Sequence, residues 1–466
     1  MDLELVMQVL SLRRGLRAHE RWTRPQLDEH QQRAVRDLRA FAYARSPFYQ
    51  RFHRGLLDRP LEELPVVTKP DLMGNFDELV TDRRVRLSDV EAHLPSVVGD
   101  SRFLDRYRVV ATSGSTGLRG IFLSDPREWA TVIASYARAQ EWAGVAISPV
   151  RRMRLAVVST TTGWHQSARV GASVRNPLVR TLRLDATDPL ADIVARLNEF
   201  QPDSLVAYAS MHRLLAEERA SGHLRIGPKA VMSASEVLTD DTRRLVAAAW
   251  EHPPFDVYAA TETAGIASEC DRHTGLHLYD DLVITEIVDE DDRPVPPGEF
   301  GARILVTVLF SRTQPLIRYA ISDSVRRSNE VCACGRPFPL LDAIQGRQED
   351  VITLPAGDGA TVAIHPNLFH DVLDRVPAGQ WQVVQEGDRL RLLVAGPRSD
   401  FDGLAVTSAI RAALDAAGAT VGGITWESVR AIPRTTVGKT PLVRADSSLT
   451  HAAQGSGAEE TRLSAL

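Results

Sequence analysis

Residues 111–120, ATSGSTGLRG, bring small and hydroxyl side chains together between two apolar segments. The flanks RYRVV and IFLSD are rich in β-branched and aromatic residues, so we expect a strand on each side of a loop. Glycines let backbone N–H groups approach a ligand closely, and hydroxyls add donors, which is the chemistry of phosphate binding. The residues that would supply it are Ser113, Gly114, Ser115, Thr116 and Gly117.

This loop is not of the Walker type. A P-loop NTPase would place a lysine and then a helix after the last glycine, whereas here no lysine follows Gly117 and the chain continues as a strand. A Gly/Ser hairpin turn that binds nothing is the alternative reading.

Three further segments carry groups that suit a nucleotide. YAATET follows an expected strand and offers the ring of Tyr258, the hydroxyl of Thr261 and the carboxylate of Glu262, an oxygen ligand suited to Mg²⁺. Asp323 follows a short apolar strand, and its carboxylate could accept hydrogen bonds from both hydroxyls of a ribose. Arg347 in GRQED supplies a charge for ribose or phosphate. Taken alone, the Thr-Glu pair also suits a helix cap and Asp323 a turn.

One lysine stands out because this chain has few. Lysine occurs only at positions 69, 229 and 439, and ordinary surface charge is supplied by arginine. Lys439 follows a glycine in the loop IPRTTVGKTPLVR, near the end of a small domain. A lysine on a mobile domain can meet a developing negative charge and then leave, although a solvated surface lysine is the alternative.

All three cysteines lie in two short segments, ECDRHTGLHLYDD and EVCACGRPFP. Cys332-x-Cys334-Gly is a tight turn, and Cys270 with His277, or with His273, would complete a tetrahedral Cys₃His site for zinc. Such a closed site would be structural and would tie the segment after residue 270 to the turn at residue 332. Three unrelated thiols are the alternative.

The middle of the chain alternates apolar runs with helical patterns, from RLAVVST at 154–160 to FDVYAAT at 255–261. This alternation predicts an α/β fold with a largely parallel sheet, and strands and turns after residue 276 predict antiparallel structure. We expect a large, multi-layer N-terminal domain with mixed sheets over residues 1–346. A small, mobile α+β domain should follow over 347–445, and the small polar residues 446–466 predict a disordered tail.

Composition narrows the class of protein. A 466-residue chain with 44% hydrophobic and 25% charged residues has the balance of a globular enzyme. The net charge of −5 gives no reason to expect a nucleic acid or membrane partner. We expect no secretory signal and no membrane span, because no long apolar run is present, and three cysteines argue against a disulfide framework, so we expect a cytoplasmic protein.

In their order and spacing, these motifs resemble the adenylate-forming superfamily of acyl-CoA synthetases and adenylation domains. From residue 26 to about 445 the chain resembles the phenylacetate–CoA ligase branch, in RAFAYARSPFYQRF, ELPVVTKPDL, SRTQPLIRYAISD and VCACGRPFPLLDAIQGRQEDVI. The resemblance implies that ATP and Mg²⁺ activate an acid as an acyl-adenylate, which is then transferred to a thiol such as that of CoA.

The resemblance also assigns roles. The loop at 113–117 would hold the β- and γ-phosphates, and Tyr258 would stack on adenine beside Ser235 and Glu236. Thr261 and Glu262 would meet phosphate and Mg²⁺, and Asp323 would hold the ribose with Arg347 nearby. Lys439 would bridge the acid carboxylate and the α-phosphate, and Asp350 would mark the hinge. Two positions depart from the family pattern: Arg119 stands near the place of a loop lysine, and Ala259 stands where glycine is frequent.

The acid is the least defined partner. Trp164, His165 and Tyr208 lie where the family has its acid pocket and would suit a small or aromatic acid, although core packing explains the large rings equally well. The acceptor could be CoA, or a separate carrier-protein thiol, an amine or another nucleophile. A nucleotide-binding protein without ligase activity is a third hypothesis, which the presence of Glu262 and Lys439 disfavours. Homodimerisation is left open.

Overall fold

The computed structural model describes residues 3–112, 118–145, 151–173, 178–347, 351–357, 360–364, 366–373, 376–433 and 439–444. The chain forms two compact units. One comprises Met1–Leu238 and Thr242–Ile344, and the other comprises Thr239–Asp241 and Gln345–Leu466. In the described part of the chain, no helix has the length and apolar character needed to cross a membrane.

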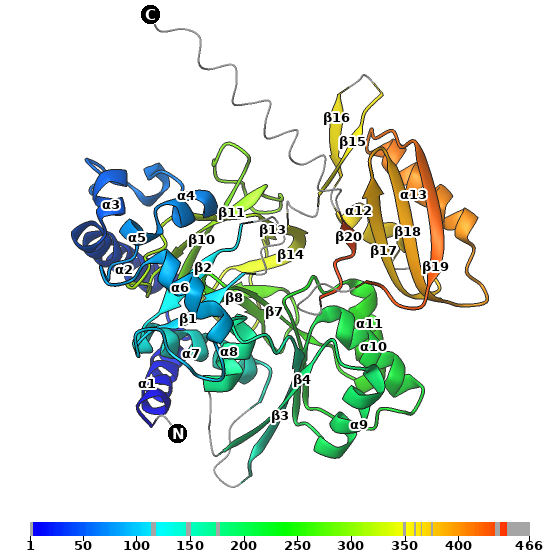
Figure 1. The fold of residues 1–466 in the computed structure, drawn as a ribbon, viewed down its shortest axis with the longest axis horizontal. Coiled ribbons are helices and arrows are strands. Elements are labelled where there is room, and N and C mark those ends of the chain that lie inside the picture. The colour runs from blue at the N-terminus through cyan, green and yellow to red at the C-terminus, as the bar shows by residue number, and fades with distance from the viewer. Residues whose placement is uncertain are drawn as a thin grey trace, which may run out of the picture. The chain divides into compact units, whose positions relative to one another are not determined.

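A nine-stranded mixed sheet forms the centre of the first unit (Figure 1). Five of its strands, β7, β6, β5, β3 and β4, pair in parallel, and β7–β8, β8–β9 and β9–β14 pair antiparallel. The predicted α/β class is therefore confirmed. Across the sheet the strands are β13 (Asp323–Arg327), β14 (Leu340–Arg347), β9 (Leu276–Leu278), β8 (Ala264–Glu269), β7 (Phe255–Ala260), β6 (Ala230–Ala234), β5 (Ser204–Ala207), β3 (Met153–Ser159) and β4 (Val179–Asp185).

Helices cover the parallel half of this sheet, as the alternating pattern predicts. Apolar residues such as Val158 and Leu205 on the strands share one buried cluster with Leu197 and Leu215 on the helices. Burying these side chains on both partners is what holds helix against strand. The helices of this layer are α9 (Leu190–Phe200), α10 (Ala209–Ala220) and α11 (Asp240–Trp250) (Figure 1).

Two further helices carry the residues that matter most for the site, α7 (Pro126–Trp142) and α8 (Gln166–Ser173). Helix α7 begins with a complete capping box, in which Asp125 accepts from the backbone N–H of Glu128 and the Glu128 carboxylate accepts from the N–H of Asp125. A proline at the first helical position fits the same start. These local signals fix where α7 begins.

The N-terminal part of the first unit is helical and packs into its largest core cluster, together with two small antiparallel sheets. The helices are α1 (Leu3–His19), α2 (Arg24–Arg45), α3 (Pro47–Phe52), α4 (Lys69–Gly74), α5 (Phe76–Leu79) and α6 (Leu87–His93), with short 3₁₀ turns at Leu61–Glu63 and Leu94–Ser96. The sheets are β1 (Arg108–Ala111) with β2 (Ile121–Ser124), and β10 (Val283–Val288), β11 (Arg303–Val308) and β12 (Tyr319–Ile321).

A buried ion pair connects distant parts of this unit. Both guanidinium nitrogens of Arg138 on α7 donate to the carboxylate of Asp281, at 2.8 and 2.6 Å, and both side chains are fully buried. His19 at the end of α1 also contacts this carboxylate, at 2.7 Å. Arg138 and His19 thereby favour the charged form and hold the pKa of Asp281 below its usual range, although burial opposes this.

The second unit is a small α+β fold with its own core. A hairpin of β17 (Ala378–Glu386) and β18 (Arg389–Pro397) is extended by parallel pairing to β20 (Val443–Arg444) on one side and β19 (Gly423–Val429) on the other. The remaining described elements are β15 (Ile352–Pro355), β16 (Thr361–Ile364), α12 (Pro366–Leu373) and α13 (Gly403–Ala416).

Candidate nucleotide site and metal centre

The strands β1 and β2 form the frame of the predicted phosphate loop. They pair antiparallel from Arg108 opposite Ser124 to Ala111 opposite Ile121. Beyond the last pair, the N–H of Thr112 donates to the carbonyl of Gly120 and the N–H of Gly120 donates to Oγ1 of Thr112, both at 2.9 Å. The two predicted strands that flank the loop are therefore present. Residues 113–117, which would bind phosphate, lie outside the described residues.

Arg119, near the place of the family's loop lysine, has a defined partner. Its guanidinium lies over the ring of Trp164, 4.6 Å from the centroid, which is cation–π geometry. The Trp164 carbonyl also accepts from the N–H of Ala111 at 3.0 Å. The loop frame and the segment at 164 are thus connected through both side chain and backbone.

Thr261 and Glu262 occupy the turn of a β-hairpin. The strands β7 and β8 pair up to Ala260 opposite Ala264, with a register shift at Tyr258/Ala259. Ala264 has a positive φ of 66°, a conformation that favours glycine and that marks the tightness of this turn. Both Thr261 and Glu262 are half-buried. The turn therefore presents a hydroxyl and a carboxylate side by side at the end of the sheet.

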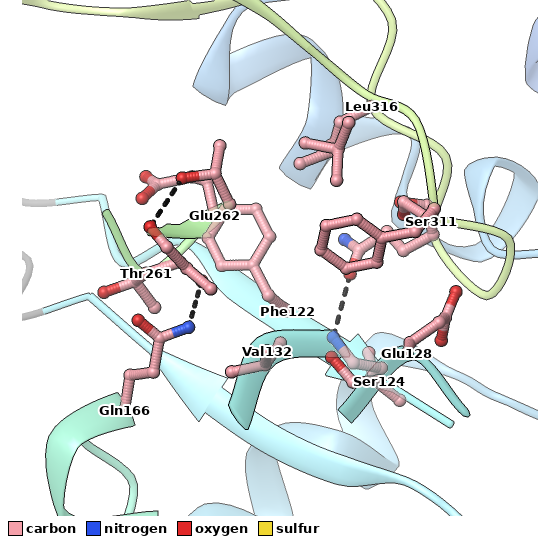
Figure 2. Close-up of a pocket in the computed structure, with 15 residues that line it drawn as sticks. Phe122, Ser124, Glu128, Val132, Gln166, Thr261, Glu262, Ser311 and Leu316 are labelled. Carbon is pink, nitrogen blue, oxygen red and sulfur yellow. Dashed lines mark hydrogen bonds between the residues drawn. The ribbon is translucent and has the colours of Figure 1, made fainter. Parts of the chain in front are cut away.

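A pocket lies beside this turn (Figure 2). The apolar residues Phe122, Val132 and Leu316 line it, together with the polar residues Gln166 and Glu128. Thr261 and Glu262 of the hairpin turn also belong to its lining. The side chains that meet there come from β2, α7, α8, the hairpin turn and the segment before β12.

Glu128 is a buried carboxylate that the protein satisfies internally. It accepts from the backbone N–H of Asp125 and Thr313, both at 2.7 Å, from the hydroxyl of Thr313 at 2.6 Å and from the N–H of Arg312. Burial raises its pKa. A carboxylate with this many donors is held in place by the fold, so we assign it a structural role.

Tyr258 and Asp323 are brought together from segments that are far apart in sequence. The Tyr258 hydroxyl donates to Oδ2 of Asp323 at 2.6 Å, and each residue is 8% exposed. Tyr258 is on β7, just before the Thr261–Glu262 turn, and Asp323 begins β13. Two of the residues predicted to bind adenosine are therefore direct neighbours.

The remaining predicted nucleotide residues are Ser235 and Glu236, which follow β6, and Arg347, at the end of β14. Ser235 follows β6 with a positive φ of 71°, and Glu236 accepts from the N–H of Ser210 at 2.8 Å, at the start of α10. A carboxylate there is stabilised by the helix dipole. Arg347 is the last residue of β14, and its side chain lies outside the described part of the structure. The predicted hinge residue Asp350 lies outside the described residues.

The three predicted acid-pocket residues are placed differently from one another. Trp164 is half-buried against the largest core cluster and His165 is almost fully buried, with Nδ1 3.0 Å from Oγ of Ser167. Tyr208 is 2% exposed and packs in the cluster between the sheet and its helices, where its hydroxyl accepts from the N–H of Thr160 at 3.0 Å. Tyr208 thus has a packing role here, and its contact with an acid stays a prediction.

Lys439 belongs to the second unit and is half-buried. It lies four residues before β20, which pairs with β17 through Val383 opposite Val443. The Gln382 amide also donates to the carbonyl of Pro441 at 2.7 Å. The segment just after Lys439 is therefore attached to the central hairpin of this unit.

The cysteines converge with one histidine into a compact cluster. The possible ligand atoms of Cys270, His277, Cys332 and Cys334 all lie within 4.8 Å of one another. Sγ of Cys270 and Sγ of Cys332 are 3.7 Å apart, and Sγ of Cys334 is 3.4 Å from Nε2 of His277. Zinc–ligand bonds of about 2.3 Å to sulfur and 2.0–2.1 Å to nitrogen place tetrahedral sulfurs about 3.8 Å apart and a sulfur about 3.5 Å from a nitrogen. The donor set therefore fits a tetrahedral metal.

Surrounding groups orient these ligands. Nδ1 of His277 lies 3.2 Å from the Phe338 carbonyl, an acceptor only, so Nδ1 carries the proton and the lone pair of Nε2 faces Cys334. Burial lowers the pKa of His277 to about 4 and raises that of Cys270 to about 12. His273 is directed elsewhere, with Nδ1 3.2 Å from the Glu269 carboxylate. Between the two histidines that the sequence left open, the geometry selects His277.

The fold is similar to that of adenylate-forming CoA ligases of known structure. In solved structures, the chain superposes on 2-hydroxyisobutyryl-CoA ligase in complex with 2-HIB-AMP with a TM-score of 0.73 at 20% identity, over 94% of this chain and 93% of that one. It also matches the anthranilate CoA ligase AuaEII in complex with anthranoyl-AMP, with a TM-score of 0.51 at 17% identity, over 75% and 67% of the two chains.

Sequence relatives agree with the fold. The chain is 25% identical over 365 residues to the phenylacetate-coenzyme A ligase of Thermus thermophilus, and this match covers 76% of each chain. It is 23% identical over 284 residues to protein CapK of Staphylococcus aureus, over 58% of this chain and 55% of CapK. No protein-family model matches. The predicted resemblance to the adenylate-forming superfamily, and to its phenylacetate–CoA ligase branch, is confirmed.

Proposed function

We propose that this protein activates a carboxylic acid with ATP, releases pyrophosphate and transfers the acyl group from its adenylate to the thiol of CoA. The observation that carries the proposal is the meeting of the Tyr258–Asp323 pair and the Thr261–Glu262 turn at one end of the central sheet. The named CoA ligases among the relatives support the same chemistry.

The roles follow from the side chains. Tyr258 and Asp323 bind adenosine through ring and carboxylate, and the backbone and hydroxyls of residues 113–117 bind phosphate. Glu262, a half-buried carboxylate, holds Mg²⁺, and Thr261 donates to phosphate. When bound, Mg²⁺ neutralises phosphate charge as two anions approach each other. Lys439 supplies the second positive charge, between the acid carboxylate and the α-phosphate.

We also propose that zinc occupies the Cys₃His cluster and serves a structural role. Four protein ligands leave no open position for substrate or water, which is the mark of a structural site. The chain has only three cysteines, and we propose a reducing compartment such as the cytoplasm.

The test is ATP–pyrophosphate exchange with a panel of acids that includes phenylacetate, 2-hydroxyisobutyrate, anthranilate, fatty acids and amino acids. Each reaction is repeated with CoA and assayed for the thioester. We expect exchange with one class of acid and a CoA thioester of that acid. Exchange without use of CoA would move the acceptor to a carrier-protein thiol or an amine. A protein that binds ATP but exchanges pyrophosphate with none of these acids would contradict the proposal.

A further inference from the structure

The turn that carries Thr261 and Glu262 is held from both sides by two adjacent residues of α7. After the turn, the N–H of Gly265 donates to Oγ of Ser135 at 3.2 Å. At the start of the turn, Tyr136 of α7 acts through Gln166. The Tyr136 hydroxyl donates to Oε1 of Gln166 at 2.8 Å, and Nε2 of Gln166 donates to the Thr261 carbonyl at 3.3 Å. Figure 2 shows the Gln166 amide directed at this turn.

Gln166 is the first residue of α8 and is only 5% exposed. Both ends of its amide are used, one as donor and one as acceptor. A buried amide that lost either partner would forgo a hydrogen bond and leave a polar group desolvated, which resists any movement of the turn away from Gln166. The turn therefore takes its position from α7, a helix with a fixed start and a buried face.

We propose that Gln166 is a positioning residue, which holds the Thr261 carbonyl so that Thr261 and Glu262 face Mg²⁺-ATP in the productive geometry. This inference rests on the proposed function of the turn. Gln166 touches neither nucleotide nor acid in this scheme, and it acts only through the backbone of Thr261. The consequence is that Gln166 sets the affinity for Mg²⁺-ATP and leaves the affinity for the acid unchanged.

Glutamate at this position makes the contact depend on pH. A protonated carboxyl group has one donor and one acceptor, like the glutamine amide, and can keep both bonds. An ionised carboxylate has no donor and would face the Thr261 carbonyl with a negative charge. Several charged or titratable groups surround the introduced carboxyl group. Glu128 and Glu262 line the same pocket, and Tyr136 contacts the side chain at position 166 directly. His165 precedes this position, and Arg169 follows it by three residues in α8. Burial and the two carboxylates should raise the pKa of the introduced group.

The experiment compares Gln166→Glu, Gln166→Leu and the wild type in ATP–pyrophosphate exchange between pH 6 and pH 9. We expect KM for Mg²⁺-ATP to rise about tenfold with increasing pH in Gln166→Glu, relative to the wild type. In Gln166→Leu, KM for Mg²⁺-ATP should exceed that of the wild type at every pH. KM for the acid should not change in either variant.

Gln314 provides a matched control. It is another buried glutamine that lines the pocket, but its amide bridges the backbone of Ile121 and Leu123 on β2 and does not reach the turn. Gln314→Glu should lower stability without a pH-dependent change in KM for Mg²⁺-ATP. Gln166 variants that fold and keep the KM of the wild type, or that lose activity only in proportion to the unfolded fraction, would overturn the proposal.

A direct binding measurement separates this inference from the proposed function. Calorimetric titration of each protein with Mg²⁺-ATP in the absence of acid reports affinity without any reaction. Weaker, pH-dependent binding by Gln166→Glu supports the inference even if no acid in the panel reacts. Equal affinity in wild type and both variants would overturn it. A wild-type protein that does not bind Mg²⁺-ATP would overturn both proposals.

Discussion

The bond between the Tyr258 hydroxyl and the Asp323 carboxylate directly links two of the residues assigned to adenosine. A hydrogen bond to a charged group contributes about 1.5–3 kcal/mol, which corresponds to about a 10- to 150-fold change in affinity. If Asp323 also accepts from the ribose, Asp323→Asn should raise KM for ATP about tenfold or more in pyrophosphate exchange.

Tyr258→Phe separates the ring from the hydroxyl. It removes the bond to Asp323 but keeps the aromatic face for the base, so KM for ATP should rise only a few-fold. KM for the acid should stay unchanged in both variants. Wild-type KM values for ATP in both variants would remove these two residues from the nucleotide site.

Lys439 is the residue to which the proposal assigns the charge of the reacting centre. Loss of a preorganised charge at a reacting centre costs about 10²–10³ in rate, so Lys439→Ala should lower the rate of adenylation by that factor. Lys229→Ala, which removes an exposed lysine of the first unit, is the control and should keep full activity. Equal activity of the two variants in pyrophosphate exchange would refute the assignment.

At this scale the sequence indicated reactive groups better than supporting ones. Glu262, Asp323 and the cysteines belong to motifs whose residue types carry their own chemistry. Gln166 and Glu128 hold the site through backbone groups of Thr261 and Thr313, over 95 and 185 residues of sequence separation. Only the folded chain determines which distant carbonyl or N–H lies opposite them, so no local pattern pointed to these long-range contacts, although the capping box of α7 includes Glu128.

The metal cluster joins three elements of the sheet, because Cys270 follows β8, His277 lies in β9 and the Cys332–Cys334 turn precedes β14. A structural zinc contributes folding free energy, so its removal should loosen this edge of the sheet. We expect about one zinc per chain by elemental analysis. A chelator, or Cys332→Ser, should remove the metal and lower Tm by several degrees.

His273→Ala is the matched control for His277→Ala. His273 contacts Glu269 and lies outside the cluster, so its loss should leave the zinc content unchanged, whereas His277→Ala should release the metal. A full complement of zinc in the His277 variant, or its loss in the His273 variant, would show that the ligand set is wrong.

Helices and strands could be predicted where their signal lay in a short stretch of sequence. They stayed ambiguous where the structure depends on distant segments. The alternation of apolar runs and helical patterns between residues 154 and 261 indicated the strands now seen as β3 and β5 and the helices α9 and α10. The Thr261–Glu262 pair suited either a strand-end loop or a helix start. It became a hairpin turn because the next residues pair with β7 and β9 to form β8, and that pairing depends on β9 and β14 further along the chain.

Two buried histidines of the molecule should make a contribution to stability that is lost in mild acid. Burial lowers the pKa of His53 and of His212 to about 4, and for His53 the nearby Arg39 adds to the effect. The unfolded chain takes up these protons near pH 6.5, but the folded protein does not. The contribution of each histidine is therefore fully present about one pH unit above 6.5 and is lost as the pH falls through 6.5 toward 4, by about 1.4 kcal/mol at pH 5.5.

Urea unfolding at pH 7.5 and pH 5.5 measures this loss for the first unit, which holds both histidines. His212→Gln removes one of the two titrating groups, so it should shrink the difference between the two pH values by about 1.4 kcal/mol. An unchanged difference in the variant would show that His212 is not a source of the acid sensitivity.

The helix α1 is synthesised well before the groups that secure it. Arg13 pairs with Glu141, 128 residues on, and His19 contacts Asp281, 262 residues on. At about 5–20 residues per second, Asp281 is made roughly 13–50 s after His19. Leu5 and Leu16 on the apolar side of α1 stay without the helix α7, against which α1 packs, until residues 126–142 have been made. The burial of α1 thus waits first for α7, and its last contact is made only when residue 281 has been synthesised.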